Sequence, residues 1–246
     1  SVVSAIKKQA EKLIHVSNLY HIEPQSQLAE KLTSLSFADK IFFCNSGTEA
    51  NEGAIKLARK YFFDQGHSER NQIITMHNSF HGRTLGSLSA TAQKKFHTGF
   101  KPLLPGFKYI PFNDLPSAQK AITPKTCAIL VEPLQGEGGV NLPDPSYIKG
   151  LKKLCKKHGI LLIFDEVQTG FGRTGKLFAY ELYNTKPDIM TLAKALGGGV
   201  AIGALAGTNR VMKSFVPGTH AATLGGNPLA CSAALATLKV LTGKNF

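Results

Sequence analysis

The sequence predicts an α/β protein whose mostly parallel sheet lies between two layers of helices. Short apolar runs alternate with longer segments of helical periodicity, and these runs are apolar at consecutive positions rather than at alternate ones. Strands that are apolar on both faces are typical of parallel sheets covered by helices on both sides. Ligands of such sheets collect beyond the carboxyl ends of the strands, so functional residues are expected just after each strand.

Four apolar runs are predicted to be strands, and three segments are predicted to be helices. The strands are expected at residues 41–44, 72–76, 127–133 and 160–167, and the helices at residues 45–62, 145–159 and 228–241. Pro145 near the start and Gly159 at the end favour the second helix. Residues 188–196 and 201–207 form two further apolar segments.

The composition is that of a globular protein, with 43% hydrophobic and 18% charged residues in a chain of 246. No run approaches the roughly 18–20 apolar residues of a membrane span, and the first residues do not form a secretory signal. The four cysteines are widely separated and have no metal-ligand spacing, so we expect buried free thiols in a reducing compartment and no metal site.

The net charge of +13 allows two interpretations, a nucleic-acid surface or an enzyme with solvated basic helices. The densest basic run, Lys152-Lys153 and Lys156-Lys157, lies in the amphipathic segment 145–159. Aromatic residues are not interleaved with it, as a stacking platform for bases would need. We therefore expect no nucleic-acid partner and no membrane partner.

Polar residues follow the predicted strands, among them His81 after the second and Glu132 at the end of the third. Ser46 and Glu49, after the first strand, have the spacing of a capping box, and Gly47 between them would let an anion approach a helix start. Asp165 and Glu166 follow the apolar run ILLIF at the start of the strand predicted over 160–167. These carboxylates could bind a metal, act as a general base, pair with a cationic ring nitrogen, or simply occupy a surface loop.

The segment from Gly170 to Gly175 matches GxGxxG, and with Lys176 it matches most of a Walker A loop. Leu177 stands where that loop needs Ser or Thr, and two carboxylates rather than the glycines directly follow the strand. Both motifs require a strand, the glycines and then a helix, so a nucleotide site is not predicted here.

Lys194 is the only charged residue in an apolar segment that ends in three glycines. Such a lysine is either an edge residue that reaches solvent or a functional amine. Desolvation lowers the pKa of a lysine and makes it nucleophilic, as Schiff-base chemistry requires.

Six segments occur in the order NSGTEANE, FHGRT, VEPLQGEGG, FDEVQTGFGRTG, LAKALGGG and TLGGNPLA. This set closely resembles the class-III, fold-type I aminotransferases, which use pyridoxal 5'-phosphate (PLP), and it covers essentially the whole chain. The stretches FHGRTLGSLSATAQKKF and GFKPLLPGFKYIPFND look most like the acetylornithine aminotransferases. The resemblance implies the three-layer fold of the large domain of fold-type I PLP-dependent transferases.

The resemblance also implies which residues contact the cofactor ring. Asp165 would keep the pyridine nitrogen protonated, and Gln168 would hydrogen-bond near the phenolic oxygen. Val167 and Phe80 would cover the two faces of the ring. Lys194 would form the Schiff base and afterwards move the proton between carbon atoms.

The phosphate and substrate contacts follow from the same resemblance. Gly47 and Thr48 would hold the phosphate at a helix start. Thr223 would reach the phosphate from the neighbouring subunit of a homodimer. Arg83 matches a substrate-contacting arginine, and Glu137 matches a carboxylate that can pair with an arginine and help to admit two different substrates.

The implied reaction moves an amino group between N-acetylornithine and 2-oxoglutarate, giving N-acetylglutamate 5-semialdehyde and glutamate in arginine biosynthesis. The alternatives are an aminotransferase for ornithine or 4-aminobutyrate, and a truncated, non-catalytic remnant of the fold. The expected location is the cytoplasm, or the mitochondrial matrix in a eukaryote.

The chain is expected to be a fragment, because chains of this family are longer at both ends. Residues 1–246 would form essentially one PLP-binding large domain, in which residues 1–25 are an N-terminal connecting segment. The C-terminal small domain would be absent, so the cofactor site would be mostly present and the substrate site incomplete.

Overall fold

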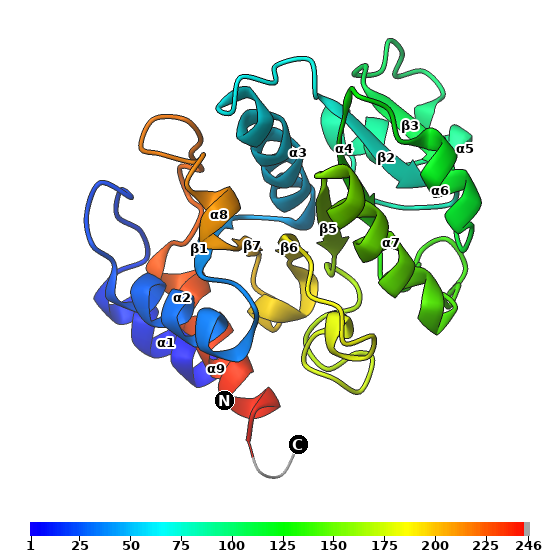
Figure 1. Cartoon of the computed structure of the whole chain (residues 1–246). Coiled ribbons are helices and arrows are strands. Elements are labelled where there is room, and N and C mark those ends of the chain that lie inside the picture. The colour runs from blue at the N-terminus through cyan, green and yellow to red at the C-terminus, as the bar shows by residue number, and fades with distance from the viewer. Residues whose placement is uncertain (244–246) are drawn as a thin grey trace.

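The computed structural model describes residues 1–243, which form a sheet of seven strands with helices on both faces (Figure 1). The strands are β1 (Lys40–Cys44), β2 (Gln72–Met76), β3 (Phe107–Ile110), β4 (Thr126–Val131), β5 (Leu161–Asp165), β6 (Ile189–Leu192) and β7 (Gly203–Gly207). Their order across the sheet is β1-β7-β6-β5-β4-β2-β3. Only β7 is antiparallel to its neighbours, so the predicted α/β class with a mostly parallel sheet is confirmed.

Both faces of the sheet are buried, as the continuous apolar runs predict. Along β5, Leu161 and Ile163 belong to one hydrophobic cluster, whereas Leu162 and Phe164 belong to the other. The first cluster is completed by α3 (Gly47–Phe63) and α8 (Asn209–Met212). The second is completed by α2 (Glu23–Leu35), α6 (Leu115–Ala121), α7 (Pro145–His158) and α9 (Pro228–Leu241).

The other helices are short or peripheral. They are α1 (Val2–Lys12), α4 (Leu85–Ala90), α5 (Lys94–His97) and the 3₁₀ turns η1 (Ala179–Glu181) and η2 (Lys194–Gly197). Residues 1–25, predicted to be a connecting segment, contain the whole of α1, which packs against α9 (Figure 1).

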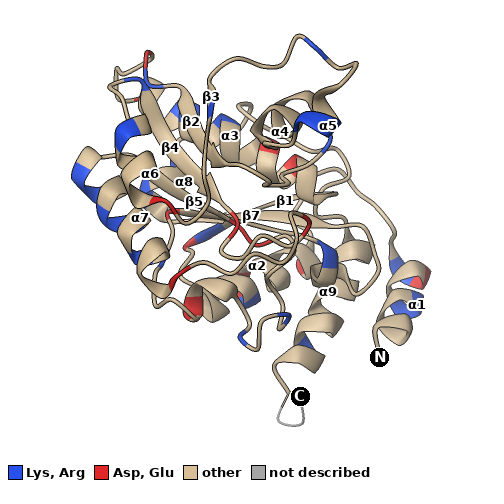
Figure 2. Cartoon of the chain, turned by 90° about the vertical axis from the view of Figure 1, so that its right-hand side faces the viewer, with Lys and Arg blue, Asp and Glu red and all other residues tan. Residues whose placement is uncertain are grey.

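The predicted elements are confirmed apart from their ends. All four predicted strands and all three predicted helices are present, and Gly159 ends α7 with a left-handed φ of 60°. The apolar segments 188–196 and 201–207 contain β6 and β7. The lysines of α7 lie on its outer side (Figure 2), which agrees with a solvated basic face.

The direction of β7 determines where the functional residues meet. Because β7 is antiparallel to both β1 and β6, these two strands point the same way as the rest of the sheet. The carboxyl ends of β1, β2, β4, β5 and β6 therefore lie along one edge. The chain enters β7 at that same edge.

The described part of the chain lacks a membrane-spanning helix and a metal-binding cluster. Within residues 1–243, no helix has the length and apolar character needed to cross a membrane, and no group of His, Cys, Asp and Glu has metal-binding geometry. Cys44, Cys127, Cys155 and Cys231 are buried free thiols. Residues 170–175 form turns that no helix directly follows, unlike a nucleotide-binding loop.

Candidate functional site

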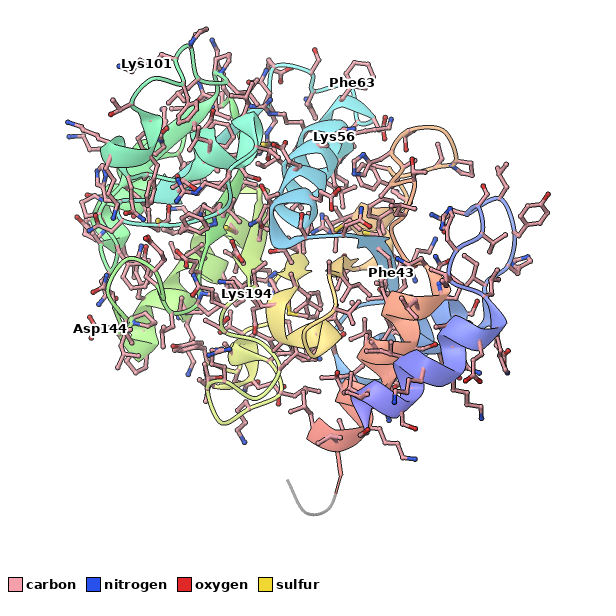
Figure 3. The ribbon with its side chains drawn as sticks, turned by 180° about the vertical axis from the view of Figure 1, so that it is seen from behind. Phe43, Lys56, Phe63, Lys101, Asp144 and Lys194 are labelled. Atoms are coloured by element: carbon pink, nitrogen blue, oxygen red, sulfur yellow. The ribbon has the colours of Figure 1, made fainter. Side chains whose placement is uncertain are left out.

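A cavity of about 490 Å³ lies at the carboxyl edge of the sheet, between the start of α3, the loops after β2 and β5, and the segment from β6 to β7. Lys194, which is labelled in Figure 3, is one of the residues that line this cavity. The predicted site residues that line it are Gly47, Thr48, Phe80, Arg83, Asp165, Val167, Gln168 and Lys194. Four separate parts of the sequence thus meet at one cavity.

The start of α3 has the geometry of an anion site. Oγ of Ser46 accepts a hydrogen bond from the backbone N–H of Glu49, and the Glu49 carboxylate accepts one from the N–H of Asn45. This is a capping box in which the glutamate reaches back one residue further than the usual N-cap N–H. The N–H groups of Gly47 and Thr48 have no carbonyl partner within the helix, because they belong to its first turn.

Gly47 also brings the start of α3 against the loop after β5. A Cβ atom on Gly47 would lie 2.7 Å from Cγ1 of Val167 and 3.5 Å from Cβ of Ala193. Only glycine fits this contact without displacing its neighbours. The helix start therefore lies close to the residue that precedes Lys194.

Asp165 ends β5 and is buried in a network of hydrogen bonds. Its Oδ2 lies 2.8 Å from Nδ2 of Asn51 and 2.8 Å from Nδ1 of His81, and its Oδ1 accepts a 3.0 Å bond from the N–H of Val167. A buried carboxylate with these partners can pair with a cationic group in the cavity.

Lys194 follows the end of β6, the strand directly beside β5. Its φ of 44° is left-handed, a conformation that costs a non-glycine residue free energy and is found at functional sites. Desolvation lowers the pKa of the Lys194 amine, and the carboxylate of Asp165 opposes this shift. A lysine with a lowered pKa carries more of the neutral, nucleophilic amine.

The loop after β2 supplies an aromatic wall. Phe80 packs edge-on against Phe96 at 5.8 Å between ring centroids. The Arg83 guanidinium lies 4.0 Å from the ring centroid of Phe96 and 5.2 Å from that of Phe80. Oγ1 of Thr48 accepts hydrogen bonds from the backbone N–H groups of Arg83 and Thr84, which attaches this loop to α3.

Two predicted site residues lie outside the lining of this cavity. The Glu137 carboxylate accepts a 2.6 Å hydrogen bond from Nε2 of Gln93 and lies 3.9 Å from Nζ of Lys95. Its partners in the described chain are thus an amide and a lysine rather than an arginine. Thr223 is exposed and lines two separate depressions together with His220.

Two buried carboxyl groups beside the site are not among the residues to which the family resemblance gives a role. Glu132 accepts a 3.1 Å hydrogen bond from the N–H of Phe80, and burial raises its pKa to about 7. Glu166 accepts bonds of 2.6 and 2.8 Å from the N–H groups of Ala179 and Tyr180, and burial also raises its pKa to about 7. Both anchor loops near the cavity by binding backbone N–H groups.

Asn51 is another member of the site that the sequence did not single out. It lines the cavity yet its residue is only 1% exposed. The available signal was its position, since it lies three, four and seven residues before Ala54, Ile55 and Ala58 on the buried face of α3. A polar residue on such a face needs a hydrogen-bonding partner.

The family model for aminotransferase class-III matches residues 1–246. The chain belongs to the class-III aminotransferase family. Its predicted family is therefore confirmed over its whole length.

Known class-III aminotransferases that resemble the chain include curated relatives and solved structures. The acetylornithine aminotransferase of Methanocaldococcus jannaschii is 58% identical over 240 residues, which are 98% of this chain and 60% of the relative. That of Caldanaerobacter subterraneus subsp. tengcongensis is 55% identical over 246 residues, 100% of this chain and 62% of the relative. This class-III chain thus spans about 60% of the length of these curated relatives.

A solved class-III fold superposes closely on the chain. The ornithine aminotransferase of Toxoplasma gondii, whose structure has PLP at partial occupancy in the active site, gives a TM-score of 0.94 at 37% identity. The match covers 98% of this chain and 58% of that one. The fold of the large domain of fold-type I PLP-dependent aminotransferases is therefore confirmed.

Proposed function

We propose that the chain is the PLP-binding part of an aminotransferase that moves an amino group between N-acetylornithine and 2-oxoglutarate. The products are N-acetylglutamate 5-semialdehyde and glutamate, a step of arginine biosynthesis. The observation that carries the proposal is that Lys194 and Asp165, at the ends of adjacent strands, line the same cavity. The substrate choice rests on the acetylornithine aminotransferases at 50–58% identity.

The residues of the cavity fit PLP in their chemistry. The first-turn N–H groups of Gly47 and Thr48 would bind the phosphate, and Asp165 would pair with the ring nitrogen. Phe80 and Val167 offer apolar surfaces for the two ring faces. The missing Cβ at position 47 lets the side chain of Val167 lie against the helix start that would bind the phosphate.

When bound, PLP supplies an electron sink for the carbon atom that carries the substrate amine. In the proposed enzyme, Lys194 would hold the cofactor covalently. Its amine, when free, would take a proton from the substrate carbon and deliver it to a carbon of the cofactor. Gln168 would donate a hydrogen bond near the phenolic oxygen. Gly136 lies close to this side chain, since a Cβ on Gly136 would be 2.8 Å from Oε1 of Gln168.

We assign substrate contacts to Arg83 and Glu137. The guanidinium of Arg83 is held by aromatic rings at the cavity and bears the positive charge that an ω-carboxylate or acyl oxygen would need. Glu137 is bound through Gln93 to the same loop region that carries Phe80, because Gln93 also donates to the carbonyl of Ser79.

We further propose that residues 1–246 act as one PLP-binding large domain within a homodimer, in which Thr223 completes the phosphate site of the other subunit. Support comes from the position of Thr223, which is exposed and lies away from the lining of the cavity. Large apolar side chains are exposed nearby, at Leu19 (90%) and Leu224 (52%). The four buried thiols are compatible with a reducing cytoplasm.

The absorbance spectrum of the purified chain with added PLP tests the cofactor assignment. We expect a visible band that borohydride removes, with the reduced cofactor located on Lys194 by peptide mass spectrometry. Lys194→Ala should lose the band, whereas Lys186→Ala, at an exposed lysine away from the cavity, should keep it. An unchanged band in Lys194→Ala would refute the assignment.

Amine additions to the same sample test the substrate assignment. N-acetylornithine should change the visible band at lower concentration than ornithine or 4-aminobutyrate does. A stronger response to ornithine would instead favour an ornithine aminotransferase.

A further inference from the structure

We propose that Asn51 is a positioning residue that fixes the carboxylate of Asp165 for its contact with the ring nitrogen of PLP. The inference rests on the proposed function, because it concerns how the cofactor's ring is held. It starts from a residue of α3 that lies one turn beyond Gly47, in the helix proposed to bind the phosphate.

The amide of Asn51 uses both its donor and its acceptor atoms inside the protein. Nδ2 donates to the carbonyl oxygen of His81 at 2.7 Å and to Oδ2 of Asp165 at 2.8 Å. Oδ1 accepts from Oγ1 of Thr191 at 2.8 Å. One side chain thereby connects α3 with the loop after β2, the end of β5 and β6.

These contacts restrict how the Asp165 carboxylate can turn. Asn51 and His81 both lie within hydrogen-bonding distance of Oδ2, while the Val167 N–H donates to Oδ1. Rotation of the carboxylate would break all three interactions. All three partners donate hydrogen bonds to Asp165. They therefore suit an ionised carboxylate, which only accepts hydrogen bonds.

The same amide also relates Asp165 to Lys194. Thr191, which donates to Asn51, is three residues before Lys194 and pairs directly with Asp165 across the sheet. One buried network thus holds together Asp165, helix α3 and strand β6, the strand that leads to Lys194. Its geometry does not depend on flexible surface contacts, since Asn51, Asp165 and Thr191 are all buried.

An amide is the group that this position requires. Aspartate has nearly the same shape, but it would place a second carboxylate 2.8 Å from Oδ2 of Asp165, where two negative charges disfavour each other. Alanine would leave the Thr191 hydroxyl, the His81 carbonyl and one donor site of Asp165 without this partner. Unpaired buried polar groups cost free energy.

The test compares the binding of PLP with that of its carbocyclic analogue, which has a C–H in place of the ring nitrogen. Dissociation constants are measured for the parent chain, Asn51→Asp and the control Asn113→Asp, together with the unfolding temperature of each without cofactor. Asn113 is an exposed loop residue outside the cavity. Asn51→Ala replaces Asn51→Asp in the comparison if the aspartate variant does not fold.

We expect the Asn51 variant to lose at least about tenfold in affinity for PLP, equivalent to about 1.4 kcal/mol, while its affinity for the analogue changes little. The visible band of bound PLP should also titrate at a different pH in this variant. The control should match the parent in both measurements. Equal losses for PLP and the analogue would mean a merely structural role and would overturn the inference.

The outcome also separates this inference from the proposed function. If the parent chain binds PLP and forms the visible band but the Asn51 variants behave like the parent, only the role of Asn51 is refuted. If the parent chain binds neither PLP nor the analogue, the proposed function fails, and the role of Asn51 fails with it.

Discussion

Nδ1 of His81 and Oδ2 of Asp165 lie 2.8 Å apart, and both side chains are buried. A carboxylate only accepts hydrogen bonds, so Nδ1 of His81 is the donor in this pair. Nε2 of the same ring is buried and has no hydrogen-bond partner in the described part of the chain. His81 therefore serves Asp165 through one nitrogen alone.

Replacing His81 by alanine should weaken the binding of PLP. The change removes one of the donors to Asp165 and opens space beside it, so we expect roughly a tenfold loss in affinity, as for a hydrogen bond to a charged group. The dissociation constant from a PLP titration measures the loss. His158→Ala, at the exposed end of α7, is the control, and an equal loss there would contradict the explanation.

Gly82→Ala should disturb the loop that carries Phe80 and Arg83. Gly82 has a φ of 134°, and a Cβ there would clash with Oγ1 of Thr48. Gly66→Ala is a matched control, because Gly66 also has a positive φ, of 82°, but open space around it. We expect Gly66→Ala to cost about 1 kcal/mol of unfolding free energy and Gly82→Ala at least about 2 kcal/mol more.

Chemical denaturation gives both free energies of unfolding. The Gly82 variant should in addition bind PLP more weakly than the Gly66 variant does. Equal stability and equal affinity of the two variants would show that the loop adapts to the added methyl group.

Glu166 should make the protein less stable as the pH rises. Burial raises its pKa from 4.5 to about 7 in the folded protein, so the folded state binds more protons than the unfolded state between these two values. The contribution of Glu166 is fully present below pH 4.5 and is lost as the pH rises through about 7, by roughly 3 kcal/mol at most.

Glu166→Gln should remove this part of the pH dependence. Its unfolding free energy should lie further below that of the parent at pH 5 than at pH 8, because the parent loses stability over this interval and the glutamine does not titrate. Urea unfolding at several pH values measures the difference. A gap that stays constant or widens with pH would contradict the shifted pKa.

Mixing two inactive variants tests the shared phosphate site. In the proposed homodimer, Lys194 and Thr223 of one site come from different subunits. Lys194→Ala and Thr223→Ala should each bind PLP poorly, and a mixture refolded together should recover part of the tight binding. No recovery, with dimers confirmed by sedimentation, would place both residues in the same subunit's site.

The sequence predicted the fold class because the signals for the central strands are local. Continuous apolar runs mark the central strands. Asp165 and Lys194 stand out as charged residues next to such runs, but their proposed roles come from the resemblance to the family. The edge strand β3 was missed, since Phe107, Lys108 and Tyr109 are only partly buried and the strand lacks a continuous apolar run. The early helix α1 was missed too, because none of its residues is buried.

Asn51 could not be assigned a role from its position in the sequence. Its partners, Asp165 and Thr191, are 114 and 140 residues away. Only the packing of α3 across the sheet brings them together. Glu137 illustrates the opposite case, since the family pattern finds the residue but not its contacts with Gln93 and Lys95.

The left-handed backbone of Lys194 has a consequence for protein engineering. Glycine adopts this conformation without strain, so Lys194→Gly should give a more heat-resistant protein that has lost its proposed chemistry. Directed evolution that selects for thermal resistance alone would favour such a change. Libraries built on this scaffold should therefore keep codon 194 fixed.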